Sequence, residues 1–206
     1  MPIRVWDGDL PEEVATALRA QGTLAVDTET SGLDWSSDVL QLIQFSSEST
    51  GPVLVRPGGT RPREITSLLE DPAVAKVFHF APFDLRFIRS AWDISAASVR
   101  CTKTASKLLN PHAPASSHSL QALLLHKLGV KIDKGSVRVG DWGAPDLTVE
   151  QLEYAAADVT HLVELHSKLD AELRDAGLSG LYRDICRYLP TDAELRVGRF
   201  PDPLTY

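Results

Sequence analysis

The alternation of apolar and polar positions in the first half of the chain is typical of strands. Short apolar runs such as LAVDT and alternating runs such as VLQLIQFS end at polar or turn-forming residues. These segments predict five strands, at residues 24–28, 39–46, 52–56, 74–80 and 96–100. The connections among the first three strands are short, which favours an antiparallel meander.

Helical periodicity appears between the later strands and fills the second half of the chain. It predicts helices at residues 63–70, 82–91, 102–109, 119–128, about 148–176 and 178–189. Thr148 and Gln151 have the spacing of a capping box at the start of the long helix. Pro190 is expected to end the last helix, because proline lacks the donor that a helix interior needs.

This order of elements predicts a single α/β domain. Three antiparallel strands, then strands alternating with helices, then helices alone, indicate layers around one sheet. The pattern fits a five-stranded mixed sheet flanked by helices, of the ribonuclease H-like type, although length and periodicity alone do not single out that fold. We expect residues 1–190 to form this domain. Residues 191–206 are expected to form a tail, either an arm that contacts another copy or a frayed end.

Composition narrows the class of protein. The chain has 206 residues, of which 43% are hydrophobic and 24% charged, and this excludes a disordered or collagen-like chain. No apolar run is long enough to span a membrane, and the first residues lack the features of a signal peptide, so we expect a cytoplasmic location. Cys101 and Cys186 are too few for a disulfide framework, and Cys101 is expected to be a small core residue.

The charge balance limits the partners that the protein can bind. The chain has 21 lysines and arginines against 28 aspartates and glutamates, which gives a formal net charge of −7. Such a balance argues against a protein that coats long nucleic acid through a basic surface.

Two acids stand at the end of the first predicted strand, in the sequence Asp27-Thr28-Glu29. Alternate residues of a strand share a face, so the two carboxylates are expected to point the same way. Unpaired carboxylates are costly to bury side by side, and a divalent cation would remove that repulsion. The alternative is a strand tip that simply emerges into solvent.

Further acids follow in two helices. Asp84 falls in the first turn of a helix, where it could merely complement the helix dipole. Tyr154 and Asp158 are four residues apart and share a helix face, although a core tyrosine and an unrelated surface aspartate would give the same spacing. Four acids that converge without cysteine or histidine partners point to Mg²⁺ or Mn²⁺, which prefer oxygen ligands.

Three segments carry a resemblance to a known family. VDTETSGL (26–33), FHFAPFDLRFI (78–88) and LTVEQLEYAAADVTHL (147–162) resemble the three motifs of the DEDD 3′-5′ exonucleases, in the order and spacing of ribonuclease D. Members carry either a tyrosine four residues before the last aspartate or a histidine five before it. Tyr154 is present and position 153 is Glu153, so the chain resembles the tyrosine subtype.

Other segments resemble a smaller group within that family. IRVWDGDLP (3–11), CTKTASKLL (101–109) and RYLP (187–190) are similar to the nano-RNase C (NrnC) group, which degrades very short RNAs. Phe80 and Cys101 depart from the usual ribonuclease D pattern but fit this group.

The resemblance implies a role for each matching residue. Asp27, Glu29, Asp84 and Asp158 would hold two divalent cations, Mg²⁺ or Mn²⁺, and Tyr154 would orient the attacking water. A second set would contact the substrate, namely Thr30, Leu33, His79 and Phe80. For Leu33 and Phe80, packing in the core is the alternative.

The implied activity is hydrolysis of dinucleotides and very short RNA from the 3′ end to nucleoside 5′-monophosphates. The alternatives are a broader ribonuclease D-like exonuclease acting on tRNA 3′ ends or single-stranded DNA, and an inactive binding module on the same fold. Lys134 and Arg138 could contact phosphates or could be solvated surface charges. The resemblance also implies a homo-oligomer, with an octameric ring as the candidate assembly.

Overall fold

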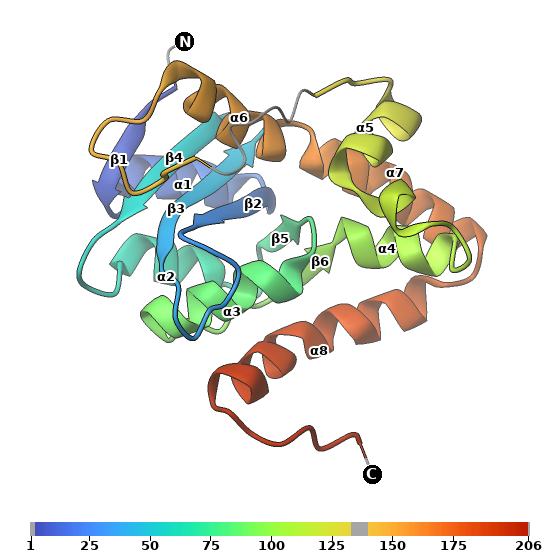
Figure 1. Ribbon diagram of the computed structural model, residues 1–206. Coiled ribbons are helices and arrows are strands. Elements are labelled where there is room, and N and C mark those ends of the chain that lie inside the picture. Colours follow the sequence, from blue (N-terminus) through green and yellow to red (C-terminus); the bar gives the residue numbers. More distant parts are fainter. Residues whose placement is uncertain (1–2, 133–139, 206) are drawn as a thin grey trace.

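A computed structural model describes residues 3–132 and 140–205 of the chain. One mixed sheet forms its centre, with strand order β1-β4-β3-β2-β5-β6 (Figure 1). The strands are β1 (Val5–Gly8), β2 (Thr23–Thr30), β3 (Leu40–Ser47), β4 (Gly51–Pro57), β5 (Ala75–Phe78) and β6 (Val99–Cys101). The predicted meander is confirmed, because β2, β3 and β4 pair antiparallel, whereas β1, β5 and β6 join by parallel pairing.

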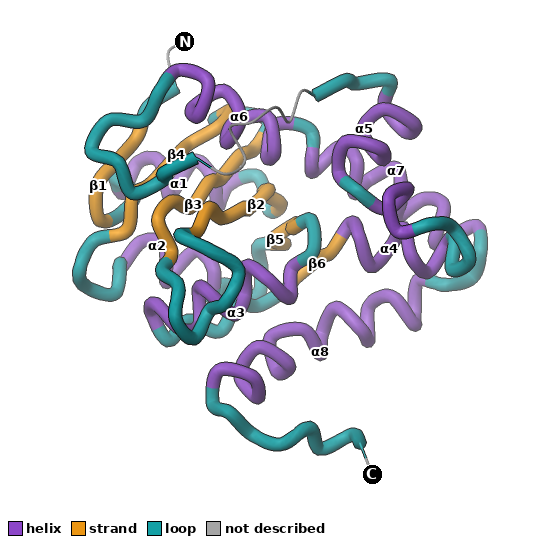
Figure 2. Tube along the Cα trace, in the orientation of Figure 1, coloured by secondary structure: helices purple, strands orange, loops and turns teal. Residues whose placement is uncertain are grey.

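Helices cover both faces of the sheet (Figure 2). They are α1 (Glu12–Ala20), α2 (Arg63–Leu69), α3 (Ala81–Trp92), α4 (Thr102–Leu109), α5 (Leu120–Leu128), α6 (Val149–Thr160), α7 (Leu162–Asp175) and α8 (Ser179–Val197), with a 3₁₀ turn at Ala115–His118. α6 lies against β2, β3 and β4. α1 and α2 contact each other beneath the opposite face.

The sheet has six strands, one more than predicted. The additional strand, β1, is four residues long and pairs only with β4 at the edge of the sheet. Its sequence VWDG is too short to show a period, and its partner lies some fifty residues further on. Helix α1 was also not predicted, although its residues Ala15 and Leu18 are fully buried in the core.

The long helix predicted at 148–176 is instead two helices. His161 leaves helical geometry, with φ −107° and ψ 8°, and separates α6 from α7. Apolar residues continue on both sides of this bend, so periodicity alone did not reveal it. The change of direction lets α6 lie on β2–β4 while α7 packs against α4 and β5.

The last helix was predicted to end before Pro190. It instead continues through this proline to Val197. Proline removes one helical hydrogen bond, yet packing can maintain the helix beyond it. α8 lies along α3, where Leu189 and Ala193 are buried and Arg86 forms a 2.8 Å ion pair with Asp192. The first residues of the predicted tail therefore belong to a helix.

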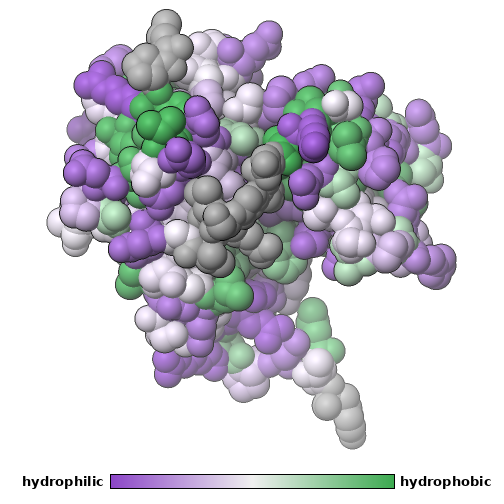
Figure 3. Space-filling view, turned by 45° about the horizontal axis from the view of Figure 1, so that its top comes forward, coloured by the Kyte–Doolittle hydropathy of each residue, from purple (hydrophilic) through white to green (hydrophobic). Residues whose placement is uncertain are grey.

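The surface seen in Figure 3 is mostly hydrophilic, with apolar residues gathered in separate patches. Within the described residues, no helix is both long and apolar enough to cross a membrane. Both cysteines are buried and free, and Cys101 is a core residue as predicted.

Candidate active site

Asp27 and Glu29, the first two acids of the predicted site, lie near the end of strand β2, beside α6. Asp27 and Glu29 alternate along β2 and pair in register with Gln44 and Leu42 of β3. Residues directly opposite in an antiparallel pair share a face, and Leu42 packs with Tyr154 of α6. Asp27 and Glu29 are thus on the α6 side of the sheet, and both are half-buried.

Helix α6 brings the other two motif residues to the same place. Its start is fixed by the predicted capping box, in which the Gln151 backbone N–H donates to Thr148 and the Thr148 N–H donates to the Gln151 side chain. Ala155 is fully buried, and its small side chain allows α6 to approach the sheet closely. Tyr154 and Asp158 consequently face inward, with 8% and 6% of their surfaces exposed.

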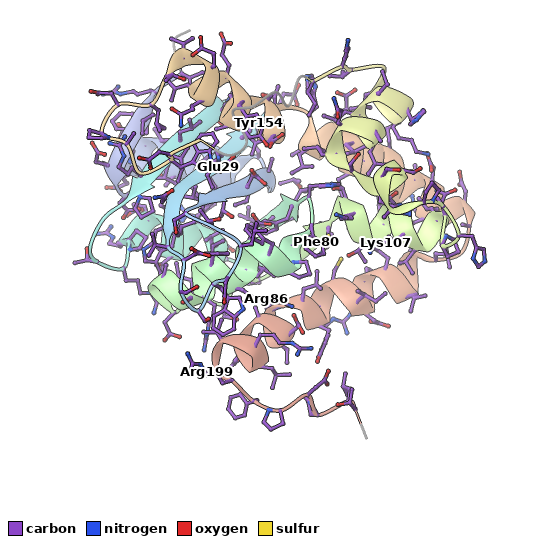
Figure 4. All side chains as sticks on the ribbon, viewed as in Figure 1. Glu29, Phe80, Arg86, Lys107, Tyr154 and Arg199 are labelled. Carbon is purple, nitrogen blue, oxygen red and sulfur yellow. The ribbon has the colours of Figure 1, made fainter. Side chains whose placement is uncertain are left out.

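Three of the four acids form a compact cluster. Asp27, Glu29 and Asp158 each offer a carboxylate oxygen, and these oxygens lie within 4.8 Å of one another. The donor set consists of oxygen alone, which fits a hard divalent cation. Tyr154 lines the same cleft, and Figure 4 shows it near Glu29, one from α6 and the other from β2.

Asp84 approaches the cluster from the first turn of α3. Asp84 is 2% exposed, and the Thr28 hydroxyl donates a 2.7 Å hydrogen bond to its carboxyl. Burial raises the pKa of Asp84 to about 7, and the charge of Asp158 adds to this, while the hydrogen bonds from Thr28 act in the opposite direction. A cation in the cleft would favour the ionised form.

A cleft of about 760 Å³ opens between β2, α3, α4 and α6. All nine residues predicted to form the site line it, namely Asp27, Glu29, Thr30, Leu33, His79, Phe80, Asp84, Tyr154 and Asp158. Motifs that are more than a hundred residues apart in sequence are thereby joined in one site.

The predicted substrate-contacting residues occupy the rim of this cleft. Leu33 is 83% exposed on the loop after β2, so it does not cover the core. Phe80 is 44% exposed and has a left-handed φ of 76° at the start of α3, so it is not a core residue either. Nδ1 of His79 is 2.9 Å from the Thr102 hydroxyl, and the Thr30 hydroxyl donates to the Gly32 carbonyl.

Sequence reasoning missed some of the lining. The ammonium group of Lys103 lies 4.6 Å from the centre of the Phe80 ring, in a cation–π contact. Trp142 packs on Tyr154 with ring centres 5.8 Å apart. Lys103 becomes part of the site only through the parallel pairing of β5 with β6, which no local pattern reveals. Lys134 and Arg138 lie outside the described residues.

A sequence profile described as "3'-5' exonuclease" matches residues 2–174. The chain belongs to this 3′-5′ exonuclease family. The chain is 32% identical to ribonuclease D of Pseudomonas paraeruginosa over 171 residues, or 81% of this chain and 43% of that protein. It is 29% identical to ribonuclease D of Cronobacter turicensis, over 90% of this chain and 48% of that protein. The chain thus spans less than half of the length of these relatives.

Solved structures agree with this assignment. The chain is similar to Brucella melitensis NrnC with bound Mg²⁺, at 31% identity, a TM-score of 0.89 and full coverage of both chains. Escherichia coli RNase D has 25% identity and a TM-score of 0.81, over 94% of this chain and 51% of that one. These likenesses confirm the predicted ribonuclease D family and the mixed-sheet α/β fold.

Proposed function

We propose that this exonuclease hydrolyses dinucleotides and very short RNA from the 3′ end, releasing nucleoside 5′-monophosphates. The observation that carries the proposal is the cluster of Asp27, Glu29 and Asp158 oxygens within 4.8 Å, beside Tyr154 in an open cleft. Similarity to Brucella melitensis NrnC bound to pGG, at 32% identity over all of this chain and 99% of that one, supports the short substrate.

The four acids are proposed to hold two divalent cations, Mg²⁺ or Mn²⁺. When bound, such ions make water more acidic and stabilise the leaving oxygen of a phosphodiester. Asp27 would contact both ions, Glu29 and Asp158 the ion nearer the attacking water, and Asp84 the other. The Tyr154 hydroxyl would orient the water by a hydrogen bond.

The rim residues are proposed to bind the substrate. Leu33 would pack against the terminal bases, and Phe80 would stack on a base, a contact that contributes about 1–3 kcal/mol. Thr30 and His79 would contact the 3′-terminal nucleotide. The exposure of Leu33 and Phe80 supports these roles, since both side chains are available at the mouth of the cleft.

The test is incubation of 5′-labelled RNAs of two and seven residues with Mn²⁺ or Mg²⁺. The wild-type protein should cleave the dinucleotide fastest, and Asp27→Ala should abolish cleavage. If the wild type and Asp27→Ala were equally inactive, the proposal would fail.

The similarity to ribonuclease D favours a second candidate, a broader exonuclease acting on tRNA 3′ ends or single-stranded DNA. Competition among a dinucleotide, a long single strand and a tRNA separates the two candidates. A strong preference for the long strands would replace the first proposal with the second.

We also propose that the protein is a cytoplasmic homo-oligomer, with an octameric ring as the candidate assembly. The free thiols of Cys101 and Cys186 fit a reducing compartment. Phe200 and Leu204 follow α8 and are 59% and 76% exposed, which suits an arm that contacts another copy. Light scattering should give a smaller particle for a chain that ends at residue 197 than for the full chain. Equal masses would exclude the arm.

A further inference from the structure

Gln44 occupies an unusual position for a polar side chain. It lies in the middle of β3 and is 0% exposed. Both its Nε2 and its Oε1 are buried and have no hydrogen-bond partner among the described residues. An unpaired amide is unfavourable in such a place, and an apolar side chain of similar size would be tolerated better. Gln44 is therefore expected to have a role other than stabilising the fold.

The register of the sheet puts Gln44 beside the acidic cluster. Gln44 is directly opposite Asp27 of β2 on one side and Leu54 of β4 on the other. Residues directly opposite in antiparallel strands share a face, with their Cβ atoms about 4.5–5.5 Å apart. Leu54 packs with Tyr154 and Ala155, so this is the face that α6 covers.

The length of the side chain suits a contact with that cluster. A glutamine amide extends beyond Cβ by two further carbons, and can therefore reach a carboxylate on the neighbouring strand. Leu54 on the other side is apolar and offers nothing to bind. Asp27 is the carboxylate in register with the amide, and it is one of the three acids whose oxygens cluster.

We propose that Gln44 is a positioning residue for Asp27 and raises the affinity of the site for divalent cations. In the metal-bound protein its amide N–H would donate to an Asp27 oxygen and hold the carboxylate in the orientation that a cation requires. Hydrogen bonds from beyond the ligands commonly orient metal-binding carboxylates in this way. The inference rests on the proposed role of Asp27 as a ligand.

The test measures Mn²⁺ binding by calorimetry and the melting temperature of the metal-free protein. Gln44→Met keeps the length of the side chain but removes the amide. It should weaken Mn²⁺ binding by about 10- to 100-fold. The melting temperature without metal should stay the same or rise by a few degrees, because an unpaired buried amide is gone.

Leu54→Met is the matched control, because it makes a similar change on the same face without removing a polar group. It should leave Mn²⁺ affinity within about twofold of the wild type. Gln44→Leu serves as a second apolar variant should Gln44→Met not fold. If either Gln44 variant folded and bound Mn²⁺ as tightly as the wild type, the inference would be overturned.

An Asp27→Asn background separates this inference from the proposed function. If Gln44 acts through Asp27, Gln44→Met should weaken Mn²⁺ binding far less in that background than in the wild type. An equal effect in both backgrounds would contradict the inference. An Asp27→Asn protein that bound Mn²⁺ like the wild type would instead contradict the proposed role of Asp27.

Discussion

Asp84 is the most deeply buried of the four site acids, and its surroundings determine how the site responds to pH. Its pKa is raised mainly by burial, so in the metal-free protein its carboxyl is largely protonated below about pH 7. A cation must displace that proton in order to use Asp84 as a ligand. A bound metal would thus stabilise the ionised form of Asp84, which is unfavourable in the metal-free protein.

The first prediction concerns the stability of the metal-free protein. The folded-state pKa of Asp84 lies above its ordinary value of 3.8, so the folded state binds more protons between about pH 4 and 7. This group therefore reduces stability as pH rises, with a slope of at most about 1.4 kcal/mol per pH unit. Asp84→Asn should remove that slope and be more stable than the wild type at pH 8. Urea unfolding with EDTA at several pH values measures the difference.

His166 acts in the opposite direction, which is why the comparison between wild type and variant is needed. Burial lowers its pKa to about 4, so it contributes stability that is lost as pH falls below about 6.5. Both proteins share this contribution, and it cancels in the difference. A difference that did not change between pH 5 and 8 would contradict the prediction for Asp84.

The second prediction is for Phe80. Phe80→Ala should raise KM for a dinucleotide about tenfold with a smaller effect on kcat, because a stacking surface at the rim is lost. Lys103 would lose its cation–π partner at the same time. Steady-state kinetics on a dinucleotide measure both constants. Tyr188→Ala, at an exposed position on α8 outside the cleft, is the control and should leave both unchanged.

At the scale of residues, the sequence motifs were sufficient for the nine predicted site residues, since each of them lines the cleft. They were not sufficient for Gln44 or Lys103. Gln41 and Gln44 are three apart in a strand and therefore face opposite sides, and only the pairing with β2 reveals which one adjoins Asp27. Such information is non-local and is absent from the pattern of a single segment.

At the scale of elements, α6 connects the sheet to the site. It lies against three strands through small side chains, and the same helix carries Tyr154 and Asp158. Its extent was misjudged from the sequence, because neither proline nor glycine marks the bend at His161. For α8 the helix was instead predicted too short, because Pro190 was expected to end it. Tertiary packing on α3 outweighs the lost hydrogen bond, and the helix continues.

The third prediction tests how closely α6 must approach the sheet. Ala155 is fully buried between α6 and the sheet, so Ala155→Leu should overpack this contact and destabilise the protein by about 1–3 kcal/mol. The displacement of Asp158 from Asp27 should also weaken Mn²⁺ binding. Glu153→Leu, at an exposed position of the same helix, should do neither. Urea unfolding and calorimetry test these outcomes, and unchanged Mn²⁺ affinity in Ala155→Leu would contradict the prediction.

The fourth prediction concerns Pro190. Because α8 is helical on both sides of this proline, Pro190→Ala restores a backbone donor and should stabilise the protein by about 1–3 kcal/mol. Pro62 precedes α2 in extended conformation, where proline costs no helical hydrogen bond. Pro62→Ala should therefore bring no comparable gain in urea unfolding. A destabilised Pro190→Ala protein would contradict this reasoning.

At the scale of the whole molecule, the structure shows where part of the net charge of −7 is located. Several of the excess acids gather at one cleft, and Lys103 contributes a positive charge to its lining within the described residues. A protein of this kind would recognise one or two phosphates rather than a long backbone. The composition alone could exclude a basic coating protein, but it could not indicate that the acids converge.

The fifth prediction follows from that distribution of charge. Few counterions are released when a short substrate binds, so the logarithm of KM for a dinucleotide should change with the logarithm of salt concentration with a slope of about 1 or less. Kinetics between 50 and 300 mM KCl (roughly the range in which such slopes are measured) test this. A slope several times larger would indicate an extended basic surface on the protein or its assembly.

The register between β2 and β3 also determines where the chain tolerates insertions and deletions. One residue added within either strand would turn every following side chain to the opposite face and separate the acids from α6. The loop between Thr30 and Leu40 is free of that constraint, and it carries Leu33. Variation in loop length could therefore change which molecules fit the cleft while the clustered carboxylates stay fixed, so that specificity can evolve independently of the acidic cluster.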